Sequence, residues 1–129
     1  PVSVRIDPLL PGINDSETDD LVRAACKAGA MHIISSNYKA RYDSLKRICL
    51  AFPAEGEALD ALLRDGDRIG GCTYLPRSLR LDLIQKVKDS AFREGVTFST
   101  CREGFAFEQG VRCDGSHLLG HDFRGQYNK

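Results

Sequence analysis

Residues 1–30 constrain the fold most, because they read as a strand, a loop and a helix in direct succession. Residues 2–6 alternate apolar and polar side chains, which is the periodicity of a strand. Pro8 is expected to end that strand, since proline cannot donate to a strand ladder. A Pro-Gly pair at 11–12 turns the chain, and the Asn-Asp-Ser sequence at 14–16 offers a helix N-cap. A strand followed directly by a helix is typical of α/β proteins.

The first helix is expected to bury an apolar stripe and to end at Gly29, because glycine is common after the last helical turn. The stripe consists of Leu21, Val22, Ala25 and Ala28. After this helix, the apolar run 31–35 is typical of a buried parallel strand, and residues 96–100 read as a final strand. The sequence therefore predicts parallel strands alternating with helices.

The segment between these strands contains further helices by the spacing of its apolar residues. The spacing predicts one helix over 43–52, a shorter one around 59–63, and a longer one from Ser78 to Glu94. Residues 67–76 read as a loop with a short extended piece. Together these elements predict a single α/β domain over residues 1–129.

Composition excludes several classes of protein. The chain of 129 residues has 18 Lys and Arg against 18 Asp and Glu, so no net charge attracts it to nucleic acid or to a membrane surface. No apolar run approaches the roughly 18 residues that a membrane span needs, and no signal peptide opens the chain. Its five cysteines are widely scattered, which favours reduced thiols over a disulfide framework. We therefore expect a soluble, cytoplasmic protein.

The last part of the chain, residues 102–129, loses any sustained periodicity and reads as an irregular tail. Four residues in or next to it have the chemistry of zinc ligands: Cys101, Cys113, His117 and His121. Eleven residues separate the two cysteines, whereas zinc fingers usually place two to four residues between them. The favoured interpretation is a buried cysteine and two solvent-facing histidines, so no metal site is predicted.

Arg5 and Asp7 are the first candidates for a ligand site. They lie two residues apart in a strand, so they point to the same side, and they lie toward the strand end where α/β proteins bind ligands. The alternative is that the two side chains pair with each other. Arg102 and Glu103 follow the last predicted strand in the same way, and they either line a pocket or cap a helix end.

Two segments resemble a known family. The sequence SVRIDPLLPGINDSE at 3–17 and the sequence VTFSTCREGF at 96–105 resemble the later part of the barrel in radical S-adenosylmethionine (radical SAM) enzymes. The most similar members are the so-called DNA repair photolyases, which are related to spore photoproduct lyase. The resemblance aligns the chain with roughly the last two-fifths of such an enzyme. It implies that the α/β fold is part of an open or partial (β/α) barrel of the TIM-barrel kind.

The resemblance also implies cofactors and roles. Arg5 would pair with the methionyl carboxylate of S-adenosylmethionine, and Asp7 would accept from a ribose hydroxyl or from substrate. Leu10 and Ser35 would lie near the adenine. Members of the family hold a [4Fe–4S] cluster on a Cys-x3-Cys-x2-Cys motif and cleave S-adenosylmethionine to a 5′-deoxyadenosyl radical. The present sequence has no such motif, since its cysteines are Cys26, Cys49, Cys72, Cys101 and Cys113.

The expected function is therefore the C-terminal part of a lyase-like radical SAM enzyme, with the cluster motif in the N-terminal half of the same protein. This chain alone is not expected to be active. A DNA-repair relative would contact nucleic acid, and the helix from Ser78 to Glu94 carries several cations, but its acidic residues favour a solvated face. The cations are Arg77, Arg80, Lys86, Lys88 and Arg93. The alternative is a small non-catalytic binding module whose tail is metal-stabilised or binds a partner.

Overall fold

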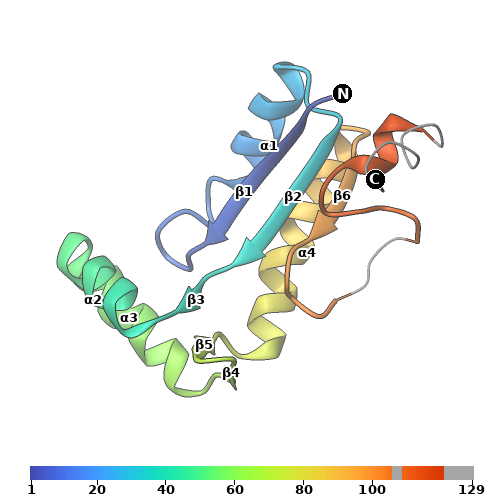
Figure 1. The fold of residues 1–129 in the computed structure, drawn as a ribbon. Helices are drawn as coiled ribbons and strands as arrows, with labels where there is room; N and C mark the ends of the chain where they lie inside the picture. Colours follow the sequence, from blue (N-terminus) through green and yellow to red (C-terminus); the bar gives the residue numbers. More distant parts are fainter. Residues whose placement is uncertain (106–108, 121–129) are drawn as a thin grey trace.

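The computed structural model describes residues 1–105 and 109–120, and its main sheet has three parallel strands (Figure 1). In spatial order the strands are β1 (Ser3–Leu9), β2 (His32–Asn37) and β6 (Thr97–Thr100). Helices α1 (Thr18–Lys27) and α4 (Arg77–Arg93) lie together on one face of this sheet. The predicted α/β class with parallel strands is confirmed. Over the described residues the sheet is open and does not close into a barrel.

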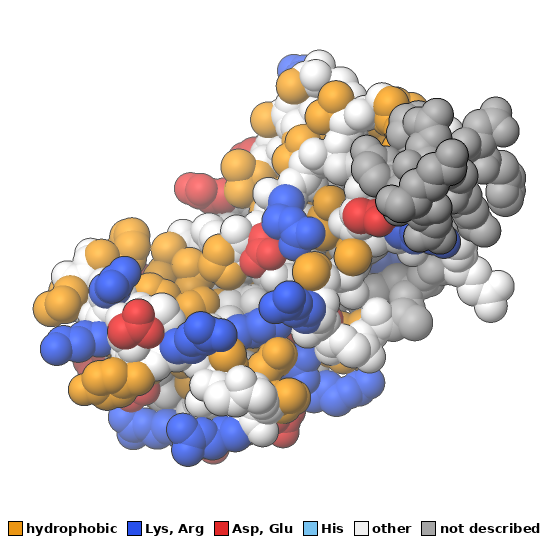
Figure 2. Space-filling view, in the orientation of Figure 1, with side chains coloured by type: hydrophobic (Ala, Val, Ile, Leu, Met, Phe, Trp, Pro, Cys, Tyr) orange, Lys and Arg blue, Asp and Glu red, His pale blue; other side chains and the backbone are white. Residues whose placement is uncertain are grey.

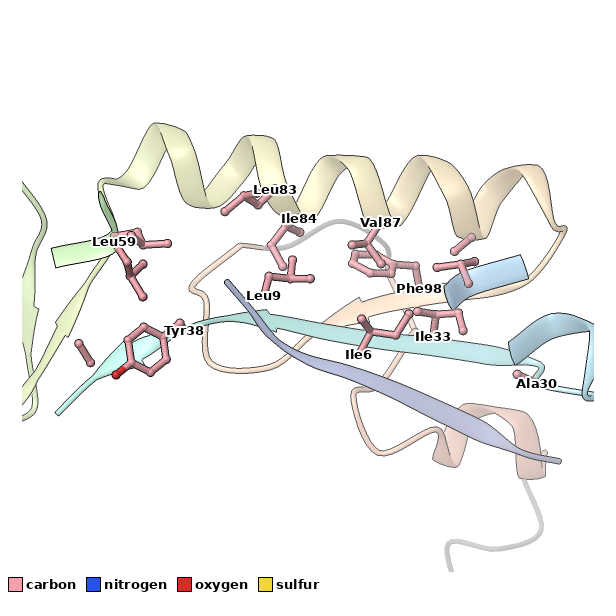
Figure 3. Packing of buried hydrophobic residues seen from close by; sticks show 14 of the residues in the cluster. Ile6, Leu9, Ala30, Ile33, Tyr38, Leu59, Leu83, Ile84, Val87 and Phe98 are labelled. Atoms are coloured by element: carbon pink, nitrogen blue, oxygen red, sulfur yellow. The ribbon is translucent and has the colours of Figure 1, made fainter. Parts of the chain in front are cut away.

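The two faces of the sheet differ in what covers them. Alternate side chains of a strand point to opposite faces. Ile33 packs beneath α4, so Ser35 shares the helix-covered face (Figure 3). Ile34 pairs with Arg5 of β1 and with Ser99 of β6, which places these three side chains on the opposite face. We call this second face of the sheet the polar face. A C-terminal 3₁₀ helix, Ser116–Leu119, lies against it.

The hydrophobic core lies between the helix-covered face and the two helices (Figure 3). Its buried members include Ile6, Ile33 and Phe98 from the sheet, Val22 from α1, and Leu83, Ile84, Val87 and Ala91 from α4. The α4 residues follow the helical spacing predicted for that segment. The stripe predicted for α1 is partly wrong, because Leu21 is 43% exposed and Ala28 is also exposed. The predicted members Val22 and Ala25 do face the core, and the half-buried Cys26, which was not predicted, lies beside it.

A helical hairpin and a second, smaller sheet extend from the C-terminal end of β2 (Figure 1). The helices are α2 (Tyr42–Ala51) and α3 (Pro53–Arg64), and the strands are β3 (Lys39–Ala40), β4 (Arg68–Ile69) and β5 (Cys72–Tyr74). This antiparallel sheet has the order β3-β5-β4. Leu59 and Leu63 of α3 join the same core as the main sheet. None of the helices in the described part of the chain is long and apolar enough to cross a membrane.

The segment predicted as a loop at 67–76 contains a β-hairpin. Ile69 pairs with Cys72, so Gly70 and Gly71 form a two-residue turn. Their φ angles are 57° and 76°, the left-handed values that a type I′ turn requires at both positions. The Gly-Gly pair was therefore the available signal for a hairpin in the sequence.

The first strand ends later than predicted. It runs through Pro8 to Leu9, with a shift in register against β2 between Ile6 and Leu9. Because β1 is an edge strand, a residue without a backbone donor is tolerated there. The start of α4 is also earlier than predicted, at Arg77, so Ser78 lies within the helix and does not cap it.

The predicted N-cap of the first helix is wrong as well, because its polar side chains close the preceding loop. Asn14 Oδ1 accepts a hydrogen bond from the backbone N–H of Leu10 at 2.8 Å. Asp15 Oδ1 accepts one from Gly12 at 2.7 Å. The helix begins only at Thr18, without a side-chain cap. Short polar side chains often bond to nearby backbone in this way instead of capping.

Candidate functional site

The candidate site is a pocket at the C-terminal ends of the parallel strands, which we call the strand-end pocket. Its volume is about 440 Å³. The lining side chains that bear on the argument are Arg5, Asp7, Ser36, Lys39, Cys101 and Arg102. Crevices at the carboxyl ends of parallel strands are the usual ligand sites of α/β proteins. The location agrees with the rim predicted from the first strand.

Arg5 and Asp7 meet at this pocket and contact each other. Arg5 Nη1 lies 3.1 Å from Asp7 Oδ2, and the two side chains remain 43% and 24% exposed. A hydrogen bond to the Cys101 side chain, and secondarily the contact with Asp7, hold the pKa of the Arg5 guanidinium above its usual value. Arg5 therefore lines the pocket as a cation that has Asp7 as its ion-pair partner. The structure therefore shows the ion pair between Arg5 and Asp7 that the sequence left as an alternative, and it also places both residues at a pocket.

Of the other two predicted cofactor contacts, neither faces the pocket. The hydroxyl of Ser35 is fully buried on the helix-covered face and donates to the carbonyl of Ile6 at 2.7 Å. Leu10 is half-buried against the core, and its backbone N–H is held by Asn14. Ser36, one residue further along β2, lines the pocket instead. A shift of one residue moves a strand side chain to the other face, so the sequence alone does not indicate which of the two serines lies on the same face as Arg5.

A buried ionic network, which we call the Glu103 anchor, supports one wall of the pocket. The Glu103 side chain is 0% exposed. Its carboxylate accepts from Lys39 Nζ and from the backbone N–H of Asn37, both at 2.8 Å, and from Arg80 Nη1 at 3.1 Å. These contacts tie the segment after β6 to the end of β2 and to α4. The anchor therefore fixes the backbone that carries Cys101 and Arg102 into the pocket.

Arg80 is buried and bonded on several sides, not exposed to solvent. It is 4% exposed, and its Nε donates to the carbonyl of Leu75 at 2.9 Å. Its guanidinium carbon lies 5.3 Å from the ring centres of both Tyr74 and Phe105. The expectation that Arg80 belongs to an exposed basic helix face is therefore wrong. The sequence of a helix does not show which of its charged residues are buried. Burial of Arg80 could be predicted only if its ion-pair partner Glu103 were known beforehand.

The three candidate zinc ligands that the structure describes, Cys101, Cys113 and His117, do not gather at one point. His117 bonds to Thr97 at the start of β6 (Nε2 to Oγ1, 3.0 Å), whereas Cys101 follows the end of that strand. The other ring nitrogen of His117 accepts from the backbone N–H of Arg112 at 3.2 Å. Cys113 is exposed, and His121 lies outside the described residues. Among residues 1–105 and 109–120, no three His, Cys, Asp or Glu side chains are placed to hold a metal ion.

His117 docks the tail by stacking against His32 of β2. The two rings meet edge to face with centroids 4.7 Å apart. His32 is fully buried, and its nitrogens contact the hydroxyls of Thr97 at 2.8 Å and Ser99 at 2.9 Å. The 3₁₀ helix Ser116–Leu119 thus covers the N-terminal end of the polar face, while the strand-end pocket lies at the other end.

Acidification is expected to destabilise the folded chain through His32. Burial, and then the neighbouring His117, hold the pKa of His32 below its ordinary 6.5. The unfolded chain therefore gains a proton at a pH where the folded chain does not. Stability is complete above about pH 6.5 and falls as the pH drops through that value toward the lower folded pKa. Urea unfolding at several pH values between 5 and 8 measures the effect, with the free energy of unfolding extrapolated linearly to zero urea at each pH.

The control is His32→Gln, which keeps polar groups near Thr97 and Ser99 but cannot titrate. Its loss of stability over the same acidic range should be smaller than that of the wild-type chain. Identical pH dependence in the two proteins would show that His32 does not carry the effect. Asp114 and Arg112 also act on the His32 ring, so the comparison is made at constant ionic strength.

Comparison with known proteins does not identify the chain: no protein-family model matches it, and neither do the curated proteins or the solved structures.

Proposed function

We propose that this chain is the C-terminal part of a lyase-like radical SAM enzyme, which completes the S-adenosylmethionine site and the substrate pocket. The observation that carries the proposal is the asymmetry of the sheet. Its helices lie on one face, and its other face is polar and leads to a pocket at the strand ends. Parallel sheets are normally covered on both faces or closed into barrels. A set of strands with helices on the outside and a polar inner face suits part of a (β/α) barrel.

The residues of the strand-end pocket fit part of S-adenosylmethionine. The Arg5 guanidinium is accessible and suited to a carboxylate, and Asp7 offers acceptors for ribose hydroxyls. Ser36 replaces Ser35 as the hydroxyl on this side. Leu10 does not line the pocket, so its proposed contact with adenine would require the loop 10–16 to move. A volume of about 440 Å³ is in the range of small-molecule sites.

The iron–sulfur cluster does not fit the described residues. A [4Fe–4S] cluster needs thiolates that converge on one point. All five cysteines are free and scattered over separate elements, and the described residues contain no metal-binding group. In this proposal the cluster is held by an N-terminal part of the same protein, where it would supply the electron that cleaves S-adenosylmethionine. The role of this chain is to bind and orient that molecule through Arg5 and Asp7.

The proposal includes partners and a location. The N-terminal half of the protein would lie against the polar face and close the barrel. Nucleic acid is the substrate class that the resemblance suggests, and the exposed Arg102 at the pocket is compatible with a phosphate. The five unpaired cysteines favour a reducing, cytoplasmic location.

The test uses the complete reading frame that contains this chain. We expect it to encode Cys-x3-Cys-x2-Cys upstream, and its reconstituted product to form 5′-deoxyadenosine from S-adenosylmethionine. Arg5→Ala should raise the KM for S-adenosylmethionine about tenfold or more, because a charge-assisted contact to the carboxylate is lost. The measurement is product formation at several S-adenosylmethionine concentrations, with visible absorbance as the check on cluster content.

The matched control is Arg23→Ala, which removes an exposed arginine of α1 that is not part of the pocket lining. It should leave the KM unchanged, and the isolated 129-residue chain should form no product. A reading frame without the three-cysteine motif would contradict the proposal. So would an Arg5→Ala enzyme with the wild-type KM.

The second candidate is a small non-catalytic binding module whose tail is metal-stabilised or binds a partner. One observation favours it: residues 115–119 already pack on the sheet through His117, Thr97 and His32. A tail that docks on its own sheet closes part of the polar face without another polypeptide. A complete reading frame no longer than this chain would favour the module over the enzyme.

A further inference from the structure

A second pocket lies between the helical hairpin and the smaller sheet, and we call it the hairpin pocket. Its volume is about 520 Å³, and none of its lining residues belongs to the strand-end pocket. Ala40 pairs with Thr73, and Thr73 pairs with Arg68, so these three side chains share one face of the β3-β5-β4 sheet. All three line the pocket. The small side chains of Ala40 and Thr73 form its floor and leave room above them.

Arginine side chains surround this floor. Arg68 rises from the sheet, Arg41 lies at the start of α2, and Arg64 lies at the end of α3. The acidic residue in the lining is Asp60, which Arg64 already binds at 2.9 Å. Figure 2 shows Lys and Arg side chains spread over this lower part of the molecule. The lining therefore keeps an excess of positive charge after its internal ion pair is counted.

The two remaining arginines are available to a ligand. The Arg68 side chain is exposed and has no hydrogen-bond or ion-pair partner in the described part of the chain. The Arg41 guanidinium bonds to the thiol of Cys72, which raises the pKa of Arg41 and leaves the charge without a buried counter-ion. Asp43 acts on Arg41 less than the thiol of Cys72 does. In the strand-end pocket, by contrast, Arg5 and Lys39 each have an acidic partner.

An exposed aromatic ring completes the hairpin pocket. Tyr42 belongs to the lining, yet it is 88% exposed. Large aromatic side chains contribute most when they are covered, and an exposed ring beside arginines is a surface on which a planar group can stack. Leu45 and Leu63 provide apolar wall beside it.

We propose that the hairpin pocket binds a small phosphorylated ligand with a planar ring, a nucleoside monophosphate in size and chemistry. Arginine forks match phosphate oxygens bidentately, which assigns the phosphate to Arg41 and Arg68. The planar ring lies on Tyr42. The volume of about 520 Å³ falls within the range of small-molecule pockets. This site is separate from the strand-end pocket, and it stands whether or not the chain is part of a radical SAM enzyme.

The test is calorimetric titration of the 129-residue chain with adenosine 5′-monophosphate, inorganic phosphate and adenosine. The monophosphate should bind, and adenosine should bind at least about tenfold more weakly, because charge-assisted bonds to phosphate are lost. Arg68→Ala and Arg41→Ala should each weaken monophosphate binding about tenfold or more. Tyr42→Ala should weaken the monophosphate but leave inorganic phosphate unchanged.

Two exposed arginines outside the pocket serve as controls. Arg47→Ala removes an 82% exposed arginine from α2, and Arg5→Ala removes a cation from the strand-end pocket. Both variants should bind the monophosphate as tightly as the wild-type chain does. Circular dichroism verifies that every variant is folded. Absence of binding, equal binding of adenosine, or equal losses in Arg47→Ala and Arg68→Ala would each overturn the proposal. If a single-stranded oligonucleotide bound much more tightly than the monophosphate, and if its binding also depended on Arg47, the proposed small-molecule site would be replaced by a nucleic-acid-binding surface.

Discussion

Replacing Glu103 with alanine is expected to lower the free energy of unfolding by about 3–5 kcal/mol, because it removes the buried carboxylate that pairs with Arg80. The remaining acidic partner of Arg80 is Asp67, which is 58% exposed and lies farther away, at 3.7 Å. The Glu103 side chain is 0% exposed, and Lys39, Arg80 and the backbone of Asn37 all bond to it. Arg80 is itself buried, so its charge cannot turn to water without opening the structure. Urea unfolding followed by circular dichroism measures the change.

Two further variants separate the charge from its surroundings. Glu57→Ala removes an exposed carboxylate from α3 and should change the free energy of unfolding by less than about 0.5 kcal/mol. Glu103→Gln keeps the shape of the side chain but removes its charge, so it should also be clearly destabilising. A Glu103→Ala protein within about 1 kcal/mol of wild type would contradict this prediction and show that the Glu103 anchor contributes little to stability.

The strands of the main sheet were predictable because their signals are local, although their spatial order was not. The alternation in the first strand, the apolar run before Ser36 and the final strand each appear in a few consecutive residues. From two-residue periodicity it also followed that Arg5 and Asp7 share one side of a strand, and they do line one pocket. These features need no knowledge of distant residues.

The rest of the site depends on contacts between distant segments. Glu103 bonds to Lys39 and Arg80, which are separated from it by 64 and 23 positions. Nothing in the neighbourhood of Glu103 in the sequence indicates that it is buried. The distinction between Ser35 and Ser36 fails for a related reason: it depends on the register of β2 against β1, and a buried central strand has little polar alternation to reveal its faces.

The smaller sheet was missed because its strands are too short for periodicity. β3 and β4 have two residues each, and β5 has three. The Gly-Gly pair at the turn is the sequence signal that marks the hairpin. Because the strands themselves show no periodicity, the arginines of the hairpin pocket could not be grouped from the sequence, although each was visible in it.

Replacing Phe98 with alanine is the second change expected to have a large effect, a loss of about 3–5 kcal/mol in the free energy of unfolding. Phe98 is 2% exposed and extends from β6 into the core between the sheet and α4, near Ile33 and Val87 (Figure 3). Alanine would leave a cavity there, because the sheet and the helix are both held by other contacts and can close the space only partly. Urea unfolding at pH 7.5, above the range in which His32 titrates, gives the value without a contribution from protonation.

Phe92→Ala is the matched control, because it makes the same chemical change on α4 at a side chain that is 79% exposed. Its effect should stay within about 0.5 kcal/mol, as for other surface positions. The difference between the two variants isolates burial from the loss of an aromatic residue as such. If the two phenylalanines cost the same, the helix-covered face would not be the core of this chain.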